Sequence, residues 1–340
     1  MFEGFAGVWT ALFPLAEVGA APRALSLAGE RLVAFRQPRG EVAVLLDRCP
    51  HRGAALSLGR VTGQGRIECP FHGWQFDAQG RNCHVPLNPE ARTSRLSAIA
   101  LATRVIGEMV WVYTGAPSPS LPEPVVAEGL RAPGLARTCL QRNWNVHWTR
   151  AMENMLDSPH LPFVHRRTIG KSLARDMTAQ SRLDVSWEPT EWGGRTKAVL
   201  DGRDGGAFLE FYRPNVMALH LPLPGRHLRI HALVIPAEAG RTRLVICQSR
   251  DFLRSRLLDP LFSWMNSRIA DEDRAVVESM GSDEVPAARA QASVATDRAT
   301  LQFRKYYFEA LRGSSWQPQH GCDPLGTGRP VAEDLADRTA

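Results

Sequence analysis

Two cysteine–histidine pairs lie close together near the start of this 340-residue chain. One residue separates Cys49 from His51, two separate Cys69 from His72, and seventeen lie between the pairs. Zinc would accept two thiolates and two imidazoles in a tetrahedral site. The same four ligands hold a [2Fe–2S] cluster in which cysteines bind one iron and histidines bind the other. The spacing predicts a metal centre of one of these two kinds, and C-x-H in place of C-x-x-C favours the cluster.

A second group of metal-binding residue types follows about a hundred residues later, in ENMLDSPHLPFVH (153–165). His160 and His165 are five apart, about 140° around a straight helix, so one ion could bind both only if the helix ends or bends between them. Pro159 and Pro162 supply such a break. Two imidazoles with one distant carboxylate would form the facial triad of non-haem Fe(II) oxygenases. Taken alone, two histidines at this spacing are a weak signal.

The run CPHRG…CPFHGW (49–74), with FDAQG after it, resembles the fingerprint of the Rieske family residue by residue. Pro50 and Pro70 stiffen the two loops, and Gly53 and Gly73 allow close backbone approach to the sulfides. The resemblance implies that the cluster ligands are Cys49, His51, Cys69 and His72.

Residues 153–165 match the iron-binding motif of Rieske oxygenases at Asn154, Asp157, His160 and His165. The resemblance implies iron ligands His160 and His165, with Asn154 and Asp157 in the catalytic machinery. Asp157 would join a Rieske histidine of a neighbouring subunit, His72, to His160, which implies a ring-shaped homotrimer.

The third iron ligand is expected in ADEDRAVVESM (270–280). Alignment on the family's acidic run selects Asp273. Asp271 and Glu272 are the neighbouring alternatives, and both are interpreted as solvated surface charges.

The elements that must position these residues can be outlined from the sequence. Residues 32–47 and 108–115 are typical of strands, and a proline-rich stretch over 115–129 indicates a domain boundary. Helical patterns follow at 144–169, 257–279 and 291–312, and alternation over 185–250 indicates an antiparallel sheet.

The predicted fold class is therefore α+β. An antiparallel β Rieske domain (1–116) precedes a catalytic domain (117–313), which the resemblance implies is a helix-grip fold. A flexible tail is expected over 314–340.

Composition limits the classes of function. Hydrophobic residues make up 44% of the chain, and no apolar run is long enough to span a membrane. The N-terminus lacks the basic region of a secretory signal, so a reducing cytoplasmic setting is expected. Cys83, Cys139, Cys247 and Cys322 are therefore interpreted as ordinary reduced thiols. The net charge of +6 suggests an acidic partner, and the scattered basic residues argue against nucleic acid.

The resemblance implies an oxygenase that receives electrons from NADH or NADPH through a separate ferredoxin or flavin-dependent reductase. Arg52, Arg60, Arg66 and Arg81 surround the cluster loops and could form the docking face for the electron carrier. The short N-terminal lead and residues 293–311 resemble homo-oligomeric monooxygenases and demethylases, such as the dicamba, vanillate and caffeine demethylases. Monooxygenation of an aromatic, heterocyclic or polycyclic molecule is therefore favoured.

Three alternatives remain: a ring dioxygenase α subunit, a Rieske-type electron-transfer protein without oxygenase activity, and a zinc-binding interaction module.

The candidate residues for the pocket wall are Leu156, Phe163, Phe208, Phe211, Asn215, Met217, Leu219 and His231.

Overall fold

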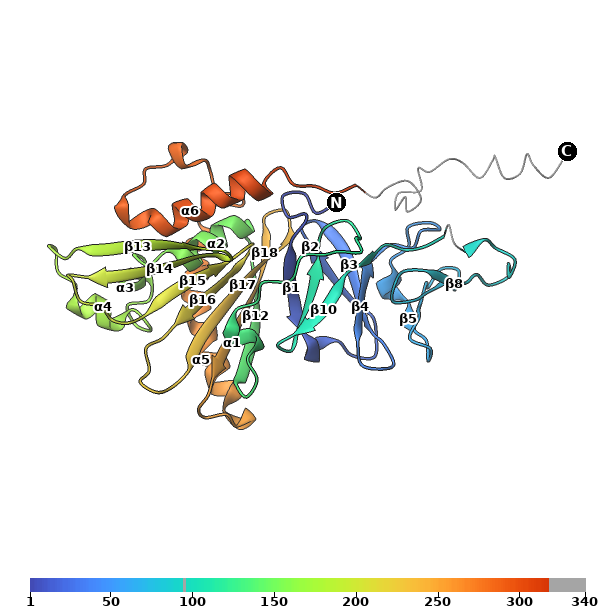
Figure 1. Cartoon of the computed structure of the whole chain (residues 1–340), viewed down its shortest axis with the longest axis horizontal. Coiled ribbons are helices and arrows are strands. Elements are labelled where there is room, and N and C mark those ends of the chain that lie inside the picture. Colours follow the sequence, from blue (N-terminus) through green and yellow to red (C-terminus); the bar gives the residue numbers. More distant parts are fainter. Residues whose placement is uncertain (94–95, 318–340) are drawn as a thin grey trace.

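The computed structural model describes residues 1–93 and 96–317 and confirms the α+β class. All paired strands in this part of the chain are antiparallel. They form three small sheets near the N-terminus and one large sheet after residue 135, which Figure 1 shows side by side. No helix within the described residues is both long and apolar enough to cross a bilayer.

The three small sheets contain three, four and four strands. The first has the order β1 (Trp9–Pro14), β11 (Met109–Tyr113) and β10 (Thr103–Ile106). The second consists of β2 (Arg23–Leu27), β3 (Glu30–Arg36), β4 (Val42–Leu46) and β9 (Ala100–Leu101). The third consists of the short strands β5 (Arg60–Val61), β6 (Ile67–Glu68), β7 (Gln75–Phe76) and β8 (Asn82–His84).

The large sheet has seven strands in the order β12-β18-β17-β16-β15-β14-β13. Their bounds are β12 (Ala136–Trp144), β13 (Leu183–Thr190), β14 (Gly193–Leu200), β15 (Phe208–Tyr212), β16 (Val216–His220), β17 (Leu228–Glu238) and β18 (Arg241–Arg250). Because consecutive strands pair from β13 to β18, hairpins build most of this sheet. Only β12 joins from a distance, on the outer side of β18.

Six α-helices within the described residues accompany the large sheet. They are α1 (Glu128–Arg131), α2 (Trp148–Leu156), α3 (Leu161–Val164), α4 (Lys171–Asp176), α5 (Asp259–Glu278) and α6 (Arg298–Tyr306). Helix α2 packs on β16–β18, α5 packs on β12, and α6 packs near β13. A π-helical turn, Tyr307–Leu311, continues α6, so the helix predicted over 291–312 begins later than its sequence pattern suggested.

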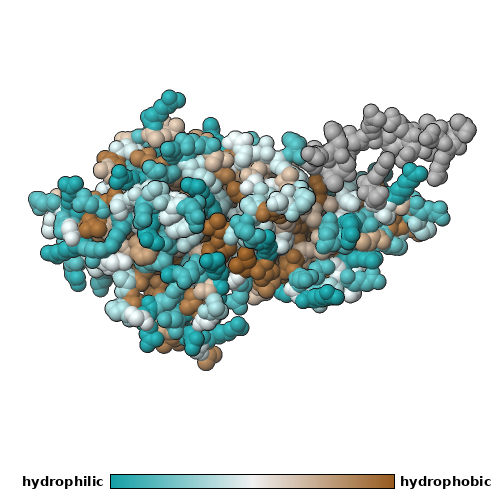
Figure 2. Space-filling model, viewed as in Figure 1, coloured by the Kyte–Doolittle hydropathy of each residue, from teal (hydrophilic) through white to brown (hydrophobic). Residues whose placement is uncertain are grey.

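One large hydrophobic core includes residues on both sides of the predicted domain boundary. Phe5, for example, packs edge-on against Trp148, with ring centroids 5.3 Å apart. A second, smaller core contains Phe35, Phe76, Cys49 and Cys69, and therefore fixes the two cluster loops. Figure 2 shows a mainly hydrophilic surface on this face, with hydrophobic residues gathered near its middle.

The interpretation of Cys139 and Cys247 as free thiols is wrong. They are directly opposite one another on β12 and β18, with Cα atoms 4.1 Å apart, and form a disulfide. The pairing of strands 108 residues apart creates this contact, and no local pattern predicts it. Cys83 is free, and Cys322 lies outside the described residues.

The start of the predicted tail is bonded to the N-terminus. The Met1 ammonium donates to the Trp316 carbonyl at 2.5 Å, and Gly4 N–H donates to the Ser314 carbonyl at 2.8 Å. Residues 318–340 lie outside the described part of the chain.

Candidate metal centres

Two histidines are brought together by a one-turn helix. Helix α2 ends at Leu156, and the short helix α3 begins after Pro159, with Pro162 in its first turn. His160 precedes α3 and His165 follows it, so the two rings leave opposite ends of one turn and meet with centroids 5.1 Å apart. The break that the two prolines predicted therefore lets both imidazoles face one point.

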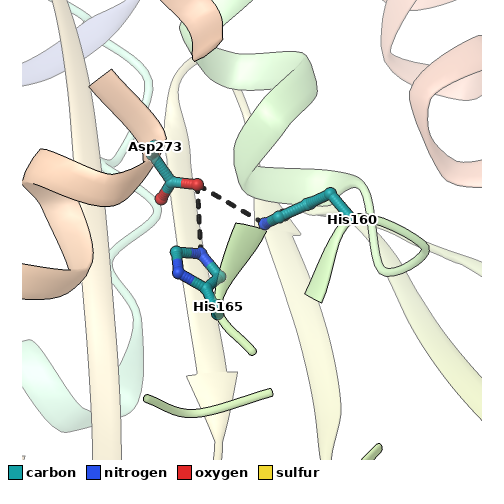
Figure 3. A group of neighbouring side chains, drawn as sticks. All are labelled: His160, His165 and Asp273. Atoms are coloured by element: carbon teal, nitrogen blue, oxygen red, sulfur yellow. Dashed lines mark ion pairs between the residues drawn. The ribbon is translucent and has the colours of Figure 1, made fainter. Parts of the chain in front are cut away.

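An aspartate from α5 completes the group. The buried stripe of α5 contains Phe262, Ala270 and Val277, but also the polar residues Asn266 and Asp273. The Asp273 carboxylate lies opposite the two rings, as Figure 3 shows. Its Oδ1 is 3.0 Å from His165 Nε2 and 3.5 Å from His160 Nε2.

The geometry and chemistry of this group suit a metal ion. One atom from each of His160, His165 and Asp273 lies within 4.8 Å of the others. Asp273 Oδ1 is buried and has no assigned hydrogen-bond donor among the described residues, although His165 Nε2 lies 3.0 Å away. A buried carboxylate oxygen without a donor requires another source of positive charge. Two imidazoles and one carboxylate are the donor set of non-haem Fe(II) sites.

The outer nitrogens of both rings are held by carboxylates. His160 Nδ1 is 3.2 Å from Asp157 Oδ2, and His165 Nδ1 is 2.9 Å from Glu272 Oε2. Thr168 Oγ1 donates to the same Glu272 oxygen at 2.6 Å. Such partners fix the ring orientation and leave Nε2 free for a metal.

Glu272 is therefore a site residue that sequence reasoning missed, because it was interpreted as a surface charge. Asp271, in contrast, fits that interpretation: it lies near Arg142 and accepts from Ser267. Burial alone would lower the pKa of His165, but the nearby carboxylates of Asp273 and Glu272 outweigh it and raise that pKa.

The loops with the cysteine–histidine pairs share one backbone pattern. Cys49 N–H donates to the Ala54 carbonyl, and Gly53 N–H donates back to the Cys49 carbonyl. Cys69 makes the same two bonds with Trp74 and Gly73. Both glycines have positive φ, 74° and 69°, a conformation that disfavours residues with a Cβ. The chain therefore presents two equivalent loops to one centre.

The side chains of these loops separate into buried thiols and exposed imidazoles. Cys49 and Cys69 are each 2% exposed, whereas His51 and His72 are exposed, with ring centroids 4.6 Å apart. Trp74 stacks flat on His51. Burial is the main cause that raises the pKa of the Cys49 thiol to about 12. Two buried thiols and two adjacent imidazoles fit a cluster whose histidine-bound iron lies at the surface.

Two known protein families match successive parts of the chain. Residues 8–100 match the Rieske [2Fe-2S] domain, and residues 144–312 match the vanillate O-demethylase oxygenase C-terminal domain. The chain belongs to the Rieske oxygenases. The family implies a [2Fe–2S] cluster and a non-haem iron, and its members are oxidoreductases that use O₂.

Individual relatives of this Rieske oxygenase differ in the reaction that their names give. Over 155 residues it is 40% identical to the 3-chlorobenzoate-3,4-dioxygenase oxygenase subunit of Comamonas testosteroni. This alignment spans 44% of this chain and 34% of the relative. It is 27% identical to methylxanthine N3-demethylase NdmB of Pseudomonas putida, over 86% of this chain and 83% of the relative. The alignments span only 34% to 61% of the lengths of five of the curated relatives.

Solved structures extend the similarity to most of the fold. The structure of Pseudomonas putida CBB5 NdmB superposes with a TM-score of 0.76 at 25% identity, over 89% of this chain and 90% of that one.

The structure places only part of the predicted pocket wall at the cavity beside the histidines. Phe163, Phe208, Met217 and Leu219 line that cavity, as does Asn154. The predictions for the other four residues are wrong; these are Leu156, Phe211, Asn215 and His231. Leu156 is buried in the core, and Phe211 packs on Phe303. The Asn215 amide donates hydrogen bonds to Thr10 Oγ1 and to the Val234 carbonyl. His231 Nε2 is 3.1 Å from Ser249 Oγ. Phe211 and His231 lie in the predicted sheet, but the face on which each side chain lies depends on register.

Two of the four arginines near the cluster are already paired. Arg60 binds Glu68 at 2.8 Å, and Arg81 binds Asp77 at 2.7 Å. These pairs reduce the positive charge that the predicted docking face can offer to an acidic carrier.

Proposed function

We propose that this chain is the oxygenase component of an NAD(P)H- and O₂-dependent Rieske monooxygenase. It would hydroxylate or oxidatively demethylate an aromatic, heterocyclic or polycyclic small molecule. The observation that carries this proposal is the convergence of His160 Nε2, His165 Nε2 and Asp273 Oδ1 on one point at a large, mainly apolar cavity.

The geometry supports a proposed set of residues for each of the two cofactors. Cys49, His51, Cys69 and His72 would hold the [2Fe–2S] cluster, and His160, His165 and Asp273 would hold the ferrous ion. When bound, the cluster supplies single electrons, and the ferrous ion supplies the activation of O₂.

The protein's own residues orient the site and enclose the substrate. Asp157 and Glu272 hold the two imidazoles by their outer nitrogens, so Nε2 of each faces the cavity. Asn154 also lines the cavity, and its side-chain nitrogen is buried without a partner among the described residues. This amide is placed to donate to a ligand beside the iron ligands.

Electrons would cross between subunits. Figure 1 shows β5 and β8, which flank the cluster loops, at one end of the molecule and α3 at the other. Within one chain the two centres are therefore far apart. His72 is exposed, and the Asp157 side chain, which contacts His160, is 28% exposed. We propose that the His72 of a second copy binds this Asp157, and that repetition of the contact closes a homotrimer.

The electron supply is proposed to be a separate ferredoxin, a flavin-dependent reductase, or both. Arg52 is exposed beside His51 and would contribute to docking. Because the reductase draws on NADH or NADPH, we place the system in the cytoplasm.

Similarity to the demethylase NdmB over most of both chains supports monooxygenation. A second candidate is a ring dioxygenase, which the 40% identity to a dioxygenase subunit favours. Incubation with reductase, NADH and ¹⁸O₂, with a panel of methyl ethers, methylamines and polycycles, separates the two. One labelled oxygen in a hydroxylated product, or formaldehyde from a methyl group, supports the proposal. A cis-diol with two labelled oxygens supports the dioxygenase, and no product from any compound contradicts both.

A further inference from the structure

A cavity of about 620 Å³ opens beside the proposed iron ligands. His160, His165 and Asp273 line it at one end, and the turn after β14 lines it at the other. Between them the wall comes from the helix-bearing face of the large sheet. Its members there are apolar side chains, among them Leu183, Ala198, Leu209, Met217, Leu219 and Ile230.

The charges on this lining are nearly all negative. Among the described residues that line the cavity, Arg203 is the single arginine and no lysine is present. Arg203 is exposed at the mouth and close enough to interact electrostatically with both Asp176 and Asp201. Asp204, also at the mouth, is paired with Lys197. The lining residues at the mouth therefore carry three carboxylates and one guanidinium, which gives a net negative charge.

The inner end is no more favourable to an anion. Asp157 and Asp273 line the cavity there, and Glu272 contacts the outer nitrogen of His165. When ionised they carry three negative charges against the two positive charges of a ferrous ion. A carboxylate that left water for the buried part of this cavity would lose its hydration without gaining a cationic side chain as a partner, which is costly.

The volume of the cavity sets a lower limit on the size of the substrate. An apolar cavity of about 150 Å³ is large enough to bind benzene. The volume of about 620 Å³ here is roughly four times larger, and falls within the range of about 300–1,000 Å³ that encloses drug-sized ligands. A single ring would leave most of the apolar wall in contact with water.

From these observations we infer that the substrate carries no negative charge and is a mainly apolar molecule of about three or four fused rings. This deepens the proposed function and rests on it for the reaction. It separates this chain from the relative named for 3-chlorobenzoate, whose substrate is a carboxylate with one ring.

Three anthracene probes of one shape test the inference. Anthracene-2-carboxamide, anthracene-2-carboxylate and 2-(aminomethyl)anthracene are titrated into the full chain with both metals bound, at pH 7 without reductant. Probe fluorescence anisotropy gives each dissociation constant. The carboxamide and the ammonium compound are each expected to bind at least about tenfold more tightly than the carboxylate. Equal or tighter binding of the carboxylate, or no binding of the carboxamide, would overturn the inference.

A pair of variants shows whether the probe occupies this cavity. Leu183 is a half-buried wall residue that pairs with Leu200 next to Asp201. Leu183→Arg places a cation on the wall and is expected to improve carboxylate binding about tenfold relative to carboxamide. Leu183→Met keeps the wall apolar and is expected to preserve the original preference. An unchanged preference in a folded Leu183→Arg protein would place the probe elsewhere and overturn the assignment.

These titrations need neither O₂ nor a reductase. Failure of probe binding with intact metal centres would refute the substrate class alone, whereas missing metals would refute the proposed function.

Discussion

At the residue scale, three side chains define the proposed iron site and one neighbour tests it. Asp273→Ala removes the carboxylate whose Oδ1 faces both imidazoles. We expect loss of the mononuclear iron with the iron–sulfur absorption retained, because Cys49 and Cys69 lie in a separate core. Iron analysis and the visible spectrum check this.

Asp271→Ala is the matched control, since Asp271 is exposed on the same helix. It should keep both centres. Loss of the mononuclear iron in the Asp271 variant, with retention in the Asp273 variant, would contradict the ligand assignment.

Glu272 would act on the proposed iron site through His165. Glu272→Gln keeps the size of the side chain but removes the charge that holds His165 Nδ1. Loss of such a partner typically weakens metal binding by about 10–100-fold. Ferrous ion titration of the stripped protein should show a decrease of this size with an unchanged cluster spectrum. Wild-type affinity for ferrous ion in this variant would show that Glu272 does not support metal binding.

At the scale of elements, the short helix α3 depends on a close backbone approach. Gly170 N–H donates to the His165 carbonyl, and a Cβ on Gly170 would lie 1.9 Å from the Leu161 carbonyl oxygen. Gly170→Ala should therefore displace α3 and reduce mononuclear iron occupancy several-fold. Gly19→Ala, with open space around the new Cβ, is the control. Full iron occupancy in Gly170→Ala would mean that α3 does not set the site.

The outer part of the large sheet contains a buried charged network around Glu210. Burial alone would raise the pKa of Glu210, but hydrogen bonds from His220, Arg195 and Tyr212 outweigh it and lower that pKa to about 2. The pKa of Glu210 is lower in the folded protein than in the unfolded chain, where it is near 4.5. The ionised carboxylate therefore stabilises the fold at pH values above about 4.5, and this stabilisation is lost as the pH falls toward 2.

Glu210→Gln should therefore cost about 1.5–3 kcal/mol of unfolding free energy near neutral pH. The deficit should be constant from pH 8 to about 5 and shrink below that. Thermal or denaturant unfolding at several pH values measures it, with the exposed Glu191→Gln as control. A deficit in unfolding free energy that grows as the pH falls would contradict a lowered pKa for Glu210 in the folded protein.

The sequence was sufficient to predict the site residues that lie close together along the chain. It was not sufficient to predict residues whose roles depend on contacts between distant segments. The prolines around His160 and His165 marked the break in the helix, and the two cysteine–histidine pairs marked equivalent loops. Glu272 could not be separated from Asp271, because the contact with His165 joins elements about a hundred residues apart. The Cys139–Cys247 pair and the positions of Phe211 and His231 depend on sheet register, which a hydrophobic pattern alone does not fix.

At the scale of the whole molecule, the two centres of one chain lie at opposite ends, so the account requires contact between copies (Figure 1). A Cys69→Ser chain lacks the cluster, and an Asp273→Ala chain lacks the iron. Each alone should be inactive. Co-assembled, a cluster on one copy lies beside an intact iron site on the next, and a measurable fraction of wild-type turnover should return with a substrate from the labelled-oxygen screen.

Adding Asp157→Asn to the Cys69→Ser chain is the control. It should remove the restored turnover while leaving the iron bound. If mixed assemblies stay inactive although both chains retain their remaining centre, the proposed contact between His72 and Asp157 is wrong.

Metal content combined with electron paramagnetic resonance of the reduced, reconstituted chain tests the account most directly. The account predicts a cluster signal of the Rieske type, with two irons and two sulfides per chain in the cluster and one further iron at His160, His165 and Asp273. A colourless protein that binds zinc and gives no signal on reduction would contradict it.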